Sequence, residues 1–135
     1  MPTELTPFLA LAGGGLVFTV AAVLSMVLRP HAPGNALLAG ALSAGFAAFS
    51  AVTIVTEGVF PVVLNHTSNL WGVQVWWDLL FSLSIAYFLI LPRAKAQGMN
   101  LILWTVFILA TASIGLLAMC SRLFWLEGQS ATRAA

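Results

Sequence analysis

The sequence predicts an all-α membrane protein, a bundle of four transmembrane helices. Of its 135 residues, 61% are hydrophobic and 7% are charged, whereas a soluble domain carries roughly 25% charged residues. Apolar runs cover residues 8–28, 35–57, 75–91 and 100–126. Each run is close to the ~20 residues that cross the hydrocarbon core of a bilayer. We therefore expect residues 1–135 to form a single integral membrane domain surrounded by lipid.

The charged residues separate by sign when the chain is threaded through four crossings. One side receives every acidic residue: Glu4, Glu57, Asp78 and Glu127. The other side receives the basic residues of the loops: Arg29, Arg93 and Lys95. Because basic loops favour the cytoplasm, this pattern predicts a plasma-membrane protein, as in the bacterial inner membrane, with both termini outside.

The first two helices are expected to meet at a turn and to differ in their packing. Pro30, Pro33 and Gly34 predict a non-helical connection after residue 28, and Asn35 can cap the second helix. The second helix carries small residues at helical spacing: Ala36, Gly40, Ala44, Ala48 and Ala51. Since small side chains let helices approach closely in lipid, this face is expected to contact a protein partner or a second copy.

The third and fourth helices are bounded by aromatic and polar residues. Gly58 and Pro61 should end or kink the second helix near Glu57, and residues 65–72 form the polar loop that follows. Tryptophan favours the membrane–water interface. The outer boundary of the third helix is therefore marked by Trp71, Trp76 and Trp77, and that of the fourth by Trp125.

Charged residues within the apolar runs form the candidate site. In the four-crossing topology Glu57, Asp78 and Arg122 lie at similar depth, near the outer boundary. Charges in the membrane usually face the bundle and pair, and arginine can serve two carboxylates. We expect Asp78 to pair with Arg122 and Glu57 to lie nearby. Gln74 lies one turn before Asp78, and the mouth of the pocket is expected at His66 and Trp76.

Two interpretations of this polar cluster remain open. As a structural element it would fix the register of the helices and neutralise itself, as polar groups between membrane helices do. As a functional element it would form an outward-facing ligand or ion site, or take part in proton-coupled chemistry at Glu57 or Asp78. No catalytic residue is assigned, because the sequence contains no nucleophile elbow and no phosphate loop. No metal or cofactor site is expected either, because the His and Cys residues lack metal-ligand spacing. The net charge of +1 gives no basic patch for nucleic acid.

Residues 77–122 resemble an uncharacterised family of small bacterial inner-membrane proteins, a domain of unknown function. The similar features are Asp78 at the start of the third helix and the connection through Arg93, Ala94, Ala96, Gly98 and Met99. A last helix with Ser113 and Gly115 leading to Arg122 completes the resemblance, although Leu116 stands where the family has a proline. The resemblance implies location and topology, without an activity.

The sequence favours an accessory or structural subunit of a membrane complex, because catalytic motifs are lacking and little of the chain lies outside the membrane. The alternative is a small carrier or ligand-binding protein that uses the polar cluster at Glu57, Asp78 and Arg122. A second alternative is a membrane enzyme acting on a lipid-soluble substrate.

Overall fold

The described part of the chain is almost entirely helical. The computed structural model describes residues 5–29 and 33–134, and these form six α-helices. Glu4, expected on the acidic side, and Pro30, expected in a turn, lie outside the described residues. Within them, three helical segments are long and apolar enough to cross a membrane: Pro7–Leu28, Ala36–Glu57 and Leu70–Ala96. The prediction of an all-α chain is confirmed, and the three segments are consistent with an integral membrane protein.

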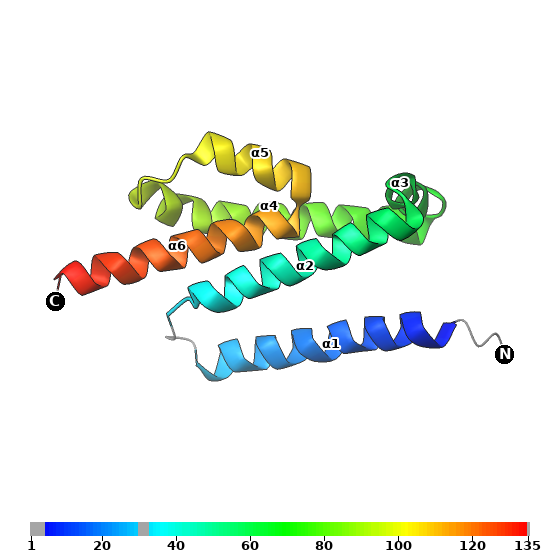
Figure 1. Cartoon of the computed structure of the whole chain (residues 1–135), viewed down its shortest axis with the longest axis horizontal. Coiled ribbons are helices and arrows are strands. Elements are labelled where there is room, and N and C mark those ends of the chain that lie inside the picture. Colours follow the sequence, from blue (N-terminus) through cyan, green and yellow to red (C-terminus); the bar gives the residue numbers. More distant parts are fainter. Residues whose placement is uncertain (1–4, 30–32, 135) are drawn as a thin grey trace. The chain divides into compact units, whose positions relative to one another are not determined.

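The chain divides into two compact units, Met1–Pro33 and Gly34–Ala135. The first contains α1 (Leu5–Leu28). The second contains the other described helices, shown in Figure 1: α2 (Ala36–Glu57), α3 (Phe60–Thr67), α4 (Leu70–Ala96), α5 (Leu101–Thr111) and α6 (Ser113–Ala134).

Local signals in the sequence set the ends of several helices in the second unit. The Asn35 side chain accepts a hydrogen bond from the backbone N–H of Leu38 at 3.0 Å, so the predicted cap of α2 is confirmed. Asn69 and Asn100 cap α4 and α5 in the same way. Gly58 ends α2 at φ 84°, a conformation that favours glycine. The second unit therefore has a Glu57 end, where α2 stops, and an Asn35 end, where it starts.

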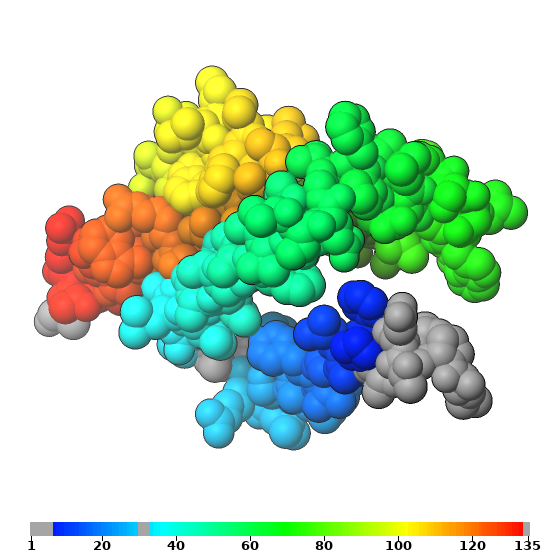
Figure 2. Space-filling model, turned by 45° about the vertical axis from the view of Figure 1, so that its right-hand side comes forward, coloured from blue at the N-terminus to red at the C-terminus, as the bar shows by residue number. Residues whose placement is uncertain are grey.

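α2 and α6 pack antiparallel along much of their length. The Ser121 hydroxyl donates to the carbonyl oxygen of Ala36 at 2.8 Å, and the Ser43 hydroxyl donates to that of Ile114 at 2.9 Å. The two contacts lie about two turns apart on each helix and occur in opposite order along the two helices, as expected for antiparallel packing. In Figure 2 the cyan start of α2 lies directly against the orange surface of α6. Ala39 and Ser43 of α2 are buried, so small residues of α2 form this contact.

The hydrophobic core lies toward the Asn35 end, where α4, α5 and α6 meet. Its buried residues are Ala94, Ile108, Met119 and Leu123. Beside this core the hydroxyls of Tyr87 on α4 and Thr105 on α5 lie 2.5 Å apart and share a hydrogen bond. Large hydrophobic side chains elsewhere in the described residues are mostly exposed, as expected for surfaces that contact lipid.

The fourth predicted helix, residues 100–126, is instead two helices that fold back on each other. α5 ends at Thr111, and Ala112 has φ 51° and ψ −119°. A Cβ on Gly115 would lie 2.9 Å from the Cα of Ile108, so the two backbones meet where only glycine fits. An apolar run shows that a segment avoids water, but it does not show whether the segment continues or reverses. The expectation of one continuous helix here was wrong.

The reversal moves Glu127 to the Asn35 end of the second unit. Its carboxylate accepts two hydrogen bonds from the Arg93 guanidinium, at 2.9 Å from Nε and 2.7 Å from Nη2. The threading through four crossings had assigned Glu127 and Arg93 to opposite sides. That assignment was wrong for Glu127, because α6 starts partway along the unit and returns toward the end of α4.

Candidate functional site

A groove at the Glu57 end is the best candidate for a binding site in the second unit. It has a volume of about 370 Å³ and lies between the last turns of α2 and the short helix α3. Its polar lining consists of Ser50, Thr53, Glu57, Asn65 and His66. Its apolar lining consists of Phe46, Phe49, Ile54, Val59, Pro61 and Val62. This arrangement matches a ligand that has an apolar body and one polar or charged end.

The backbone at residues 57–61 creates the groove. Gly58 turns the chain away from the axis of α2 after Glu57, and Pro61 lies in the first turn of α3, where its missing N–H has no helical partner to lose. Phe46, Ser50, Thr53 and Glu57 follow one another at helical spacing, so they share a face of α2. The rings of Phe46 and Phe49 stack with centroids 6.3 Å apart and form the apolar part of that face.

Glu57 is the only charged carboxylate that lines this groove, and it is the last residue of α2. The C-terminus of a helix carries a partial negative charge from its unpaired carbonyl groups. A carboxylate at this position adds to that charge and makes this end of the groove electronegative. Among the described residues the only ion pair is Arg93–Glu127, so no described side chain neutralises Glu57.

His66 is held in a fixed orientation between α3 and α4. Its Nδ1 lies 2.5 Å from the carbonyl oxygen of Val62; since that oxygen can only accept, Nδ1 carries the proton. The imidazole ring also packs against Trp76 of α4, with centroids 5.3 Å apart. These contacts leave Nε2 as the imidazole atom that can meet a ligand.

Gly72 allows α3 and α4 to come close enough for this contact. A Cβ at position 72 would overlap the backbone carbonyl oxygen of Asn65. The backbone N–H of Gly72 donates to the Asn69 side chain at 2.8 Å, which holds the first turn of α4 in place. Sequence reasoning missed this requirement, because a glycine in a polar stretch is also typical of an ordinary turn.

The six residues of the predicted polar cluster are divided among separate places. Glu57 and His66 line the groove, and Trp76 contacts His66. Gln74 and Asp78 line a different hollow on α4, of about 320 Å³, together with Trp71, Val75, Trp77 and Phe81. The Arg122 guanidinium lies 4.5 Å from the centroid of Trp125.

The expected pairing of Asp78 with Arg122 is not formed. Arg122 adjoins Ser121, which contacts Ala36 at the start of α2, whereas Glu57 is the last residue of that helix. A helix of 22 residues is about 33 Å long at 1.5 Å per residue, so Arg122 lies far from the groove. The cause is the reversal at Ala112, which directs α6 toward the Asn35 end.

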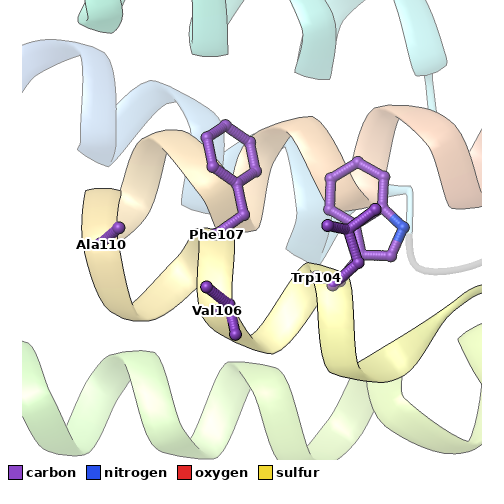
Figure 3. A pocket seen from close by; sticks show the side chains of 5 residues that line it. Trp104, Val106, Phe107 and Ala110 are labelled. Atoms are coloured by element: carbon purple, nitrogen blue, oxygen red, sulfur yellow. The ribbon is translucent and has the colours of Figure 1, made fainter.

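A second hollow, of about 430 Å³, lies on α5 and is lined by Leu103, Trp104, Val106, Phe107 and Ala110. Figure 3 shows Trp104 and Phe107 projecting from the same side of α5, and their ring centroids are 6.1 Å apart. No charged side chain lines this hollow, so it offers apolar contact without a group that selects a ligand.

The groove supplies one carboxylate, one imidazole and several aromatic rings. No group of three or more His, Cys, Asp or Glu side chains that could hold a metal occurs among residues 5–29 and 33–134. This chemistry suits reversible binding of a cation that has an apolar body. Comparison of the chain with protein-family models, with curated proteins and with solved structures gives no significant match.

Proposed function

We propose that this protein is a small integral membrane protein that binds a lipophilic organic cation in the groove between α2 and α3. The observation that carries the proposal is the position of Glu57, a carboxylate that no described residue pairs with, at a helix C-terminus and at one end of a largely apolar and aromatic groove. The carboxylate would attract the cationic centre. The rings of Phe46 and Phe49 would contact the apolar body.

The negative charge of Glu57 selects the class of ligand in this proposal. A neutral or anionic molecule of the same shape would meet the same apolar walls, but an anion would be repelled by Glu57 and by the carbonyl groups that end α2. The imidazole Nε2 of His66 can accept a hydrogen bond from a protonated amine. Ammonium groups with apolar substituents are therefore the preferred class.

The test uses two ions of matched shape, tetraphenylphosphonium and tetraphenylborate, with the purified full chain in detergent. Calorimetry or equilibrium dialysis should show binding of the phosphonium cation and no comparable binding of the borate anion. Replacing Glu57 by Gln should weaken cation binding by roughly tenfold, the effect of losing one charge–charge attraction near a protein surface. The control is Asp78→Asn, which removes an exposed carboxylate outside the groove and should leave the affinity unchanged. Equal losses in the two variants would refute the assignment.

We also propose that the membrane is a bacterial plasma membrane and that the chain crosses it three times. In this topology α5 and α6 form a hairpin that enters from the Asn35 end. The basic residues support cytoplasmic placement of that end, because Arg93, Lys95, Arg122 and Arg133 are all carried there by the last turns of α4 and by α6.

A second candidate function is that of an accessory subunit that packs against another membrane protein. It is favoured by the small residues of α2 that α6 does not cover: Ala41, Ala44, Ala48 and Ala51 are exposed. Crosslinking in native membranes tests it. If α2 contacts a partner or a second copy, Ala48→Leu should abolish the crosslinked species, whereas Val52→Leu on another exposed position should preserve it.

A further inference from the structure

Beyond the groove, we propose that the outer face of α6 binds the headgroup of an anionic phospholipid. Arg122, Trp125, Gln129 and Arg133 follow one another at steps of three, four and four, so they share one face of the helix. We call these four residues the α6 stripe. Arg122 and Arg133 are exposed, and Trp125 is 47% exposed. A hollow of about 490 Å³ lies beside the last three residues of the stripe, lined by Phe124, Trp125, Gly128, Gln129, Thr132 and Arg133.

The α6 stripe starts at the level where the membrane boundary is expected. The hydroxyl of Ser121 contacts the carbonyl oxygen of Ala36, the first residue of α2. Because Ala36–Glu57 is a candidate membrane span, Arg122 lies at the edge of the hydrocarbon core and the next turns of α6 pass through the headgroup layer. Tryptophan and arginine both favour this layer.

Arg122 is prepared for a phosphate group by its neighbours. Its guanidinium lies 4.5 Å from the centroid of the Trp125 ring, a stacking contact that restricts the side chain while leaving its N–H groups available. The nearest described acid on α6, Glu127, is already bound to Arg93 through both carboxylate oxygens. No described carboxylate pairs with Arg122. A phosphodiester is the anion that this layer of a membrane supplies, and arginine binds it through two parallel hydrogen bonds.

The charge balance at this end favours an anionic lipid over a zwitterionic one. Arg122 and Arg133 lie on the α6 stripe, and Lys95 is exposed in the last turn of α4. Anionic headgroups are enriched on the cytoplasmic leaflet and are attracted by clustered Arg and Lys. A choline headgroup would bring its own positive charge to this surface and gain less. We therefore assign the stripe to phosphatidylglycerol-type lipids.

The test is native mass spectrometry of the full chain in detergent, titrated with phosphatidylglycerol or phosphatidylcholine of the same acyl chains. The parent protein should retain phosphatidylglycerol in clear preference to phosphatidylcholine. Arg122→Gln should reduce retained phosphatidylglycerol by about tenfold, as expected for a lost charge-assisted contact. Arg29→Gln, the same change at the exposed residue after α1, should reduce it less than about twofold if the stripe is a specific site rather than a diffuse basic surface.

Further arms of the experiment distinguish the alternatives. Arg122→Lys keeps the positive charge but loses the planar guanidinium that forms two parallel hydrogen bonds. This variant should therefore bind phosphatidylglycerol several-fold more weakly than the parent. Equal losses in Arg122→Gln and Arg29→Gln, or full binding by Arg122→Lys, would overturn the proposal. Displacement of the lipid by millimolar inorganic phosphate would also overturn it, because the stripe would then bind a free anion rather than a headgroup. Circular dichroism of each variant confirms that the helices are intact.

Discussion

Two glycines of α2, Gly40 and Gly45, lie on different faces of the helix and have different surroundings. A Cβ on Gly40 would lie 3.0 Å from the hydroxyl oxygen of Ser121 on α6, whereas a Cβ on Gly45 would meet no atom within 4 Å. Gly40 therefore permits close packing of two helices, and Gly45 faces outward. Helices in lipid associate through such close backbone contact between small residues.

We predict that Gly40→Leu destabilises the protein and that Gly45→Leu does not. A leucine at position 40 would push α6 away from α2, and overpacking of this kind costs about 1–3 kcal/mol. The same change at position 45 adds an exposed side chain and improves helix propensity, by up to about 1 kcal/mol. Thermal unfolding in detergent, followed by circular dichroism, compares the pair. Equal midpoints for the two variants would show that α2 does not pack on α6 through Gly40.

The Arg93–Glu127 ion pair positions α6 against α4 more than it stabilises the fold. Its side chains are 48% and 30% exposed, and exposed ion pairs typically contribute roughly 0–1 kcal/mol. Its geometry is nevertheless specific, because both carboxylate oxygens are engaged and the guanidinium lies 5.5 Å from the ring centroid of Phe124. The pair aligns the last turn of α4 with α6.

At the level of the elements, the reversal between α5 and α6 depends on one backbone position. Ala112 has φ 51° and ψ −119°, a conformation that L-residues rarely adopt and glycine adopts readily. Its N–H donates to the carbonyl oxygen of Ile108 at 2.6 Å, which closes the end of α5. The next helix then starts at Ser113 and packs beside α5, with Gly115 against Ile108.

We predict that Ala112→Gly stabilises the protein by about 1 kcal/mol, because it relieves the strain of a positive φ. In a continuous helix the same substitution would cost about 1 kcal/mol, so the sign of the change distinguishes the two structures. Ala118→Gly, inside α6, is the control and should destabilise. Chemical or thermal unfolding in detergent measures both. A loss of stability in Ala112→Gly equal to that in Ala118→Gly would favour an unbroken helix.

At the scale of the whole molecule, the direction of α6 decides where the C-terminus lies. Residues 100–126 as one crossing would place Glu127 opposite Arg93. The hairpin instead brings these residues into contact at the Asn35 end. In the three-crossing topology proposed above, the basic residues of α4 and α6 gather on the side to which α6 returns.

Cysteine labelling in intact cells tests this topology in a Cys120→Ser background. We predict that Asn69→Cys, between α3 and α4, reacts with an impermeant maleimide. Lys95→Cys and Gln129→Cys should react only after the membrane is permeabilised, because the hairpin returns α6 to the side of the α4 C-terminus. Labelling of position 129 in intact cells together with protection of position 95 would contradict the hairpin and support a fourth crossing.

Part of the candidate site could be predicted from single residues and local spacing. The steps from Ser50 through Thr53 to Glu57 placed these side chains on one face of α2, and all three line the groove. The loop predicted over residues 65–72 was wrong, because residues 65–67 end α3 and residues 70–72 begin α4, but the expected proximity of His66 and Trp76 is present. The rest of the predicted cluster depended on Arg122 lying at the same depth, which required an unbroken helix after residue 100.

The sequence by itself determined the helical class, the apolar segments and the helix ends where Asn or Gly provides a cap. These features follow from local chemistry: hydropathy, side-chain hydrogen bonds to nearby N–H groups, and backbone conformations open to glycine. Only the tertiary structure decided which side of α2 packs on α6, that α5 and α6 reverse at Ala112, and that Glu127 binds Arg93. Such choices depend on contacts between residues distant in sequence, and the apolar pattern of a membrane helix is nearly the same whether the segment crosses or turns back.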